Sequence, residues 1–173
     1  LLIGRRTGRG LIAAGIGSRA MAPIDPARLD AIFKAYDVRG TVPDQLDAAI
    51  VENIGAAFAR FALDEGGSVP KVLVSRDMRP SGVELADAFA RGVTSQGVDV
   101  EHLGLCSTDE LFFAAGRYDA PGAQLTASHN PAGYNGIKLA LAGARPVGED
   151  SGLAEIKAMA ATGLDAAPVA GSV

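Results

Sequence analysis

One segment of the chain combines residue types that could bind and transfer a phosphoryl group. It reads Thr126-Ala127-Ser128-His129-Asn130-Pro131 and continues through Gly133 and Gly136 to Lys138. A serine hydroxyl can act as a nucleophile, a histidine titrates near neutral pH, and a lysine supplies positive charge for a phosphate. The bare composition of the segment also suits an ordinary turn, because serine, asparagine and proline are common turn residues.

The flanking residues predict how Ser128 is positioned. Residues 122–127 form an apolar run typical of a strand, and residues 136–142 predict a second strand that returns beside it. Asn130-Pro131 and Gly133 indicate the turn between them, so Ser128 is expected at the corner where the first strand ends. A serine-hydrolase triad is excluded because the serine and histidine are adjacent, and no Gly-x-x-x-x-Gly-Lys-[Ser/Thr] phosphate loop occurs.

The rest of the chain alternates between helical and extended patterns. Leu46, Ile50, Ile54, Phe58 and Phe61 recur at helical spacing, and Gly66-Gly67 ends that helix. Similar patterns predict strands over 71–75 and 98–103, and helices over 81–96, 109–118 and 149–162. Ser81 is a possible N-cap of the first of these helices. This alternation predicts a three-layer α/β/α fold with a mainly parallel mixed sheet. Ligands gather at the carboxyl ends of such strands, so the segments after residues 75 and 127 are expected on one edge.

Composition predicts one soluble domain with an appended terminus. The 173 residues are 48% hydrophobic, and no apolar run reaches the roughly 20 residues needed to cross a bilayer. The single Cys106 excludes an internal disulfide and is compatible with the cytoplasm. The net charge of −4 argues against nucleic-acid binding. Residues 1–22, which are Arg-rich and lack acidic residues, predict an unstructured extension, with a secretory signal as the alternative; residues 23–165 predict the domain, and residues 166–173 a linker.

The complete serine segment resembles the phosphoserine loop of the α-D-phosphohexomutases, the family of phosphomannomutases, phosphoglucomutases and phosphoglucosamine mutases. Residues 33–40, with the string Tyr-Asp-Val-Arg-Gly, resemble the opening segment of that family, and residues 72–81 resemble its Gly-x-Asp-x-Arg-Pro-Ser turn. Two positions depart from the pattern. Ser75 stands where the family usually has glycine, and Thr108-Asp109 stands where a Thr-Pro pair is common, which concerns local turn geometry more than phosphate chemistry.

The resemblance implies roles for individual residues. Ser128 would carry a phosphoryl group and pass it to a hexose phosphate through a hexose 1,6-bisphosphate, and its phosphate would also ligate Mg²⁺. Lys138 and Arg39 would be the cations that contact the phosphate. His129 would be a proton shuttle or a neutral hydrogen-bond partner of the phosphate, with a loop-ordering residue as the alternative, and Tyr36 would either line the sugar site or belong to the core.

Two residues of the second signature are expected to support the loops instead. Arg79 is predicted to brace them, and Asp77 to cap a turn and not to bind a metal.

The resemblance also implies further domains. Members of the family have four domains, and the later ones carry an Asp-Gly-Asp-Gly-Asp metal loop, a string that this sequence lacks. We therefore expect the chain to be the first domain of a cytoplasmic mutase, with the remaining domains of the same polypeptide as its partners, and to be inactive by itself. Residues 141–147 resemble bacterial phosphomannomutases more than phosphoglucosamine mutases, and this resemblance implies mannose phosphates as substrates, with glucose phosphates as further substrates. The alternative is a non-catalytic module that binds phosphate or a partner on a mutase-like scaffold.

Overall fold

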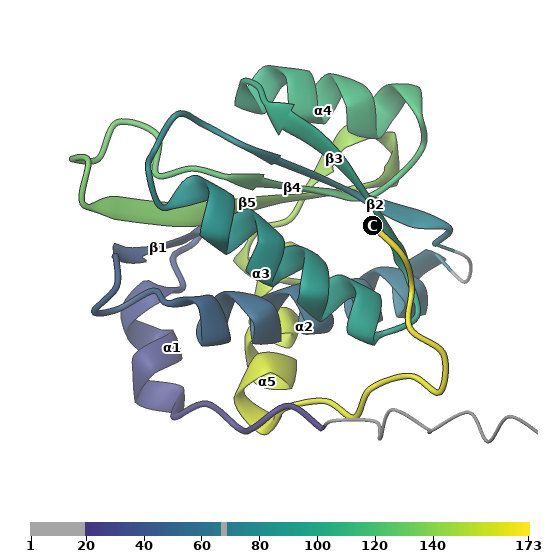
Figure 1. The fold of residues 1–173 in the computed structure, drawn as a ribbon, viewed down its shortest axis with the longest axis horizontal. Helices are drawn as coiled ribbons and strands as arrows, with labels where there is room; N and C mark the ends of the chain where they lie inside the picture. The colour runs from purple at the N-terminus through teal and green to yellow at the C-terminus, as the bar shows by residue number, and fades with distance from the viewer. Residues whose placement is uncertain (1–19, 67–68) are drawn as a thin grey trace, which may run out of the picture.

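The structure, a computed structural model, describes residues 20–66 and 69–173. The expected extension, residues 1–22, lies almost entirely outside the described residues. Within them, a mixed sheet is covered by helices on both of its faces, with α4 on one face and α1, α2, α3 and α5 on the other (Figure 1). The predicted three-layer α/β/α fold is confirmed.

The helices are α1 (Pro26–Ile32), α2 (Ala48–Gly66), α3 (Gly82–Ser95), α4 (Thr108–Arg117) and α5 (Leu153–Thr162), with two 3₁₀ turns, η1 (Ala142–Ala144) and η2 (Glu149–Ser151). The strands are β1 (Val38–Thr41), β2 (Lys71–Arg76), β3 (Asp99–Leu105), β4 (Gly122–Leu125), β5 (Tyr134–Leu141) and β6 (Arg145–Pro146).

The sheet has the strand order β1-β5-β4-β2-β3, and β6 pairs with β5. Strand β2 is parallel to both β3 and β4, whereas β5 is antiparallel to β4, β1 and β6. Strand β5 is therefore the one strand of the described sheet that runs against the others, and the predicted mainly parallel mixed sheet is confirmed. The carboxyl ends of β2 and β4 lie side by side, as expected for the two signature segments.

The larger part of the core lies between the sheet and helices α2 and α3. All five residues of the predicted stripe, from Leu46 to Phe61, are buried there, and the rings of Phe58 and Phe89 pack with centroids 6.0 Å apart. A smaller cluster of Leu73, Leu111, Ala114 and Ala120 fills the space beneath α4. Burial of this apolar surface fixes the sheet from both faces and so holds the strand ends in place.

The predicted helix over 149–162 is wrong in its first turn. The chain forms the short turn η2, breaks at Gly152, and only then begins α5. Gly152 has a φ of 122°, and a Cβ there would lie 2.1 Å from the ring of Phe61. The break depends on a close contact with α2, which residue periodicity within 149–162 cannot reveal.

The last residues pack against the domain. The backbone N–H groups of Ala167 and Gly171 donate to the carbonyls of Ser95 and Thr94, and Val100 N–H donates to the Ser172 carbonyl at 2.7 Å. This segment returns to the sheet beside β3 (Figure 1). We call residues 164–173 the C-terminal strap; that it links the domain to further domains stays a prediction.

Candidate functional site

Ser128 lies just past the end of β4, with its side chain exposed at the corner that the sequence predicts. Its φ of 53° is in the left-handed region, which costs a non-glycine residue roughly 1–2 kcal/mol. The backbone N–H of Ser128 donates to Thr126 Oγ1 at 3.0 Å, which helps to hold this conformation. The fold therefore presents the serine hydroxyl outward from an otherwise buried strand end.

Arg79 holds the loop that follows the serine. Its two terminal nitrogens donate to four backbone carbonyls at 2.8–2.9 Å, those of Ser128, Asn130, Pro131 and Tyr134. Its Nε donates to Asp77 Oδ2 at 3.1 Å. These contacts use all five N–H donors of a guanidinium, so Arg79 has none left for a ligand. The expectation that Arg79 braces the loops is confirmed.

Asp77 links this arginine to the serine strand. Its Oδ1 accepts from the backbone N–H of Arg79 at 3.0 Å, and its Oδ2 accepts from the Thr126 hydroxyl at 2.7 Å. The predicted turn-capping role is therefore confirmed. Both carboxylate oxygens are engaged, and within residues 20–66 and 69–173 no group of three His, Cys, Asp or Glu residues could hold a metal ion.

Arg39 and Lys138 come together on neighbouring strands. Arg39 lies on β1 opposite Gly136, so Lys138 is close by on β5. Both cations donate to the same oxygen, Asp37 Oδ2, Lys138 at 2.9 Å. Arg39 also donates to Asn130 Oδ1 at 2.6 Å, which ties it to the serine loop.

These two cations retain free donors, unlike Arg79. Arg39 makes one side-chain hydrogen bond from each terminal nitrogen, which leaves one proton free on each, and Lys138 uses one of the three protons that an ammonium can donate. Arg39 and Lys138 can therefore each contact an additional acceptor such as a phosphate oxygen. The residues nominated from the sequence did not include Asp37, although its place two positions before Arg39 was a signal for an ion pair.

A hollow of about 380 Å³ opens beside this cation pair, lined by Lys34, Ala35, Tyr36, Asp37, Arg39 and Lys138. Tyr36 is 79% exposed, so the alternative that placed it in the core is wrong. A wide aromatic face next to two cations can contact the apolar side of a sugar ring.

His129 is exposed beside the serine. Its Nδ1 lies 3.5 Å from Ser128 Oγ, and its ring makes no other polar contact with the described residues. The geometry allows proton exchange with the serine oxygen after a small rotation, because catalytic hydrogen bonds are often long before a substrate binds.

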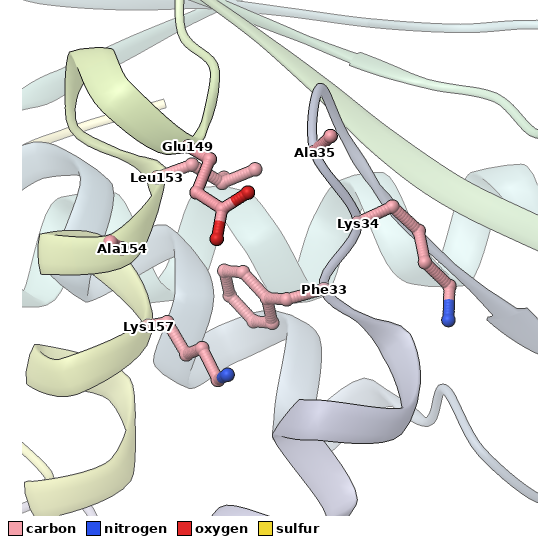
Figure 2. Close-up of a pocket in the computed structure, with 7 residues that line it drawn as sticks. All are labelled: Phe33, Lys34, Ala35, Glu149, Leu153, Ala154 and Lys157. Atoms are coloured by element: carbon pink, nitrogen blue, oxygen red, sulfur yellow. The ribbon is translucent and has the colours of Figure 1, made fainter.

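A second hollow of about 160 Å³ lies between the α1–β1 connection and α5 (Figure 2). Its lining includes two lysines and Glu149; Lys34 Nζ donates to the Ala31 carbonyl at 2.6 Å, and Lys157 pairs with Asp30 at 2.5 Å. Figure 2 shows the Lys34 side chain extending away from Glu149 and Lys157, so the two lysines do not point toward a common position. This hollow is therefore a weaker phosphate site than the one beside Arg39 and Lys138.

The two departures from the family pattern have structural explanations. Ser75 is buried within β2, where its hydroxyl donates to Gln124 Oε1, and Gln124 Nε2 donates to the Cys106 carbonyl at 3.0 Å. Thr108 and Asp109 begin α4 behind the capping residue Ser107. Neither position makes a hydrogen bond to Arg39 or Lys138.

Comparison with known proteins gives the family. The model described as phosphoglucomutase/phosphomannomutase, alpha/beta/alpha domain I, matches residues 30–166. A phosphomannomutase of Vibrio cholerae is 39% identical over 129 residues, which are 74% of this chain and 28% of that protein. A phosphomannomutase of Klebsiella pneumoniae is 40% identical over 129 residues, which are 74% of this chain and 79% of that sequence. A solved phosphoglucomutase/phosphomannomutase family protein of Burkholderia thailandensis superposes with a TM-score of 0.70 and 35% identity, over 82% of this chain and 32% of that one.

The chain therefore belongs to the phosphoglucomutase/phosphomannomutase family, as its domain I. It spans under a third of the length of the Vibrio and Burkholderia relatives. No helix among the described residues is long and apolar enough to cross a membrane.

Proposed function

We propose that this chain is the phosphoserine-bearing domain of a phosphohexomutase that interconverts hexose 6-phosphate and hexose 1-phosphate through a hexose 1,6-bisphosphate. The observation that carries the proposal is the difference in free hydrogen-bond donors among the three basic residues Arg79, Arg39 and Lys138. Arg79 uses all of its donors on the loop and on Asp77, whereas Arg39 and Lys138 keep donors free, and Arg39 is hydrogen-bonded to Asn130 of the loop that carries the exposed Ser128. Phosphoryl transfer depends on such positioned charge more than on covalent chemistry.

In the proposed reaction, phosphorylated Ser128 donates its phosphoryl group to the free hydroxyl of a hexose phosphate. The bond between phosphorus and Ser128 Oγ breaks as the bond to the sugar oxygen forms, and the proton of the sugar hydroxyl ends on the serine oxygen or on His129 beside it. Arg39 and Lys138 stabilise the charge on the equatorial phosphate oxygens. The reverse step, at the other phosphate of the bisphosphate, restores the phosphoserine.

Mg²⁺ fits this site only through the phosphate. Asp37 and Asp77 are already engaged with cations, so phosphate oxygens on Ser128 are the ligands that this chain would supply. The metal would neutralise charge on the phosphoryl group. The remaining ligands would come from outside the described residues.

Mannose phosphates are the favoured substrates, with glucose phosphates as a second possibility, in keeping with relatives named phosphomannomutase. The competing function is a non-catalytic module that binds phosphate or a partner. It does not require a nucleophile held in a strained, exposed conformation, and Ser128 is held in one.

Mass spectrometry of the gene product purified from its own cells tests the proposal. We expect one phosphate on the peptide that contains Ser128, and loss of both that phosphate and the interconversion of mannose phosphates in a Ser128→Ala variant that unfolds at the same temperature. An unmodified Ser128, or equal turnover by the variant, would contradict the phosphoserine mechanism and favour the binding module.

A further inference from the structure

Thr126 connects the nucleophile loop to the ion pair beneath it. Its side chain is almost fully buried, and its hydroxyl makes two hydrogen bonds at once. The oxygen accepts from the backbone N–H of Ser128 at 3.0 Å, and the proton is donated to Asp77 Oδ2 at 2.7 Å. A hydroxyl can do both because it is a donor and an acceptor together.

Asp77 is itself fixed. It accepts from the backbone and the Nε of Arg79, and Arg79 in turn donates to the carbonyl of Ser128 at 2.9 Å. The peptide groups on either side of Ser128 Cα are therefore both hydrogen-bonded, the N–H to Thr126 and the C=O to Arg79. Thr126 and Arg79 are in turn both hydrogen-bonded to Asp77. These two contacts restrain φ and ψ of Ser128, whose φ of 53° is unfavourable for a serine.

We propose that Thr126 is a positioning residue for phosphoryl transfer at Ser128, acting through the backbone of the serine and not through contact with substrate. The inference rests on the proposed function. In the loading step, Ser128 Oγ forms a bond to a phosphorus of hexose 1,6-bisphosphate, the bond from that phosphorus to the sugar oxygen breaks, and the serine proton passes to the sugar oxygen. The direction of Ser128 Oγ sets the line of attack, and that direction follows from the backbone that Thr126 holds.

The substitution Thr126→Val isolates the role of the hydroxyl. Valine has nearly the same shape, so the buried site stays filled, but both hydrogen bonds of the hydroxyl are lost. The substitution Thr126→Ser keeps the hydroxyl and is the matched control. The Thr126 side chain is hydrogen-bonded to Asp77 and Ser128, and not to Arg39 or Lys138. Both substitutions should therefore change binding of the bisphosphate little.

The first measurement uses the gene product made in its own cells, with each variant stripped of phosphate and reloaded from hexose 1,6-bisphosphate. Intact mass gives the initial rate of phosphate uptake at Ser128 at several concentrations. We expect Thr126→Val to lower the maximal rate about 100-fold with a half-saturating concentration within about threefold of wild type, and Thr126→Ser to restore most of the rate. A Thr126→Val rate equal to wild type, or a loss confined to the half-saturating concentration, would overturn the positioning role.

The second measurement does not depend on activity. Amide exchange of Ser128, followed by NMR on the 173-residue chain, should be slowed in wild type and in Thr126→Ser, and about tenfold faster in Thr126→Val. If wild type takes up no phosphate, the proposed function is contradicted, and the amide measurement still decides whether Thr126 holds the serine. Equal exchange rates of the Ser128 amide in all three proteins would contradict the claim that the Thr126 hydroxyl holds the backbone of the serine.

Discussion

The basic residues around Ser128 have different roles because their surroundings leave them different numbers of free donors. Arg79 is almost buried, with 9% of its side chain exposed, and is surrounded by acceptors that belong to the protein. Arg39 and Lys138 share a single carboxylate, Asp37, so the pair carries a net positive charge toward the adjacent hollow. A net positive pair with unused donors attracts a phosphate, whereas a saturated arginine stabilises a loop.

Replacing Arg79 by lysine tests the bracing role, because it keeps the charge and removes the planar fork of donors. Lysine can donate three hydrogen bonds, so at least two of the five acceptors lose their partner. We expect Arg79→Lys to lower the free energy of unfolding by about 2–4 kcal/mol, measured by urea denaturation.

The matched control is Arg91→Lys, at an exposed arginine on α3 that pairs with Glu52. It should change the free energy of unfolding by less than about 0.5 kcal/mol. Equal effects at the two positions would show that the hydrogen bonds of Arg79 do not carry the stability of the loop.

The C-terminal strap is held to β3 by a carboxylate. The backbone N–H and the hydroxyl of Ser172 both donate to Asp99 Oδ1, and these bonds lower the pKa of Asp99 below its ordinary 3.8. A carboxyl group whose pKa is lower in the folded state stabilises that state above its unfolded pKa. The contribution is lost as the pH falls through the folded pKa.

We therefore expect the strap to loosen in acid, below pH 3.8. In wild type, the NMR shift of the Ser172 amide should titrate with a midpoint below that value while the domain stays folded. In Asp99→Ala, the titration should disappear, and the difference in unfolding free energy between the two proteins should shrink below pH 3.8. A Ser172 midpoint above 3.8 would contradict this account.

Elements with strong local patterns could be predicted from the sequence. The buried stripe of α2 and the β4–β5 return depend on residues near one another in the chain, and both were predicted within a few residues. Strand β1 was not predicted, because its four residues become a strand only by pairing with β5. Helix α1 was also missed, although Asp25 before Pro26 is a local start signal.

The residues of the candidate site also divide into those that could be predicted from local sequence and those that could not. Ser128, Arg39 and Lys138 could be nominated from a contiguous pattern or a resemblance. The contacts of Asp37 with both cations, and of Thr126 with Asp77, required the register of β5 against β1 and the packing of the β2 end on β4. Gly136 lets β5 lie close to β1 in this register, since a Cβ at that position would lie 2.2 Å from the Val38 carbonyl oxygen. Such contacts between distant segments cannot be inferred from residue periodicity alone.

At the scale of the part of the molecule that the structure describes, the residues proposed to face a phosphate lie on an open surface. Ser128 and His129 are exposed, Tyr36 is 79% exposed, and the hollow beside Arg39 and Lys138 is bounded by six residues of two neighbouring segments. Phosphoryl transfer between a serine and a sugar requires the sugar to be oriented and water to be excluded. Among the described residues, no enclosing wall covers Ser128 or the pair of Arg39 and Lys138.

We therefore predict that the 173-residue chain by itself does not interconvert hexose phosphates. The purified chain, supplied with mannose 1-phosphate, Mg²⁺ and a catalytic amount of hexose 1,6-bisphosphate, should form mannose 6-phosphate no faster than its Ser128→Ala variant. The gene product from its own cells, assayed in parallel, is expected to exceed that background by at least about 10⁴-fold, because an oriented and water-shielded transfer gains several powers of ten in rate. Turnover by the chain that disappears in Ser128→Ala would show instead that the open site orients the sugar without any further wall.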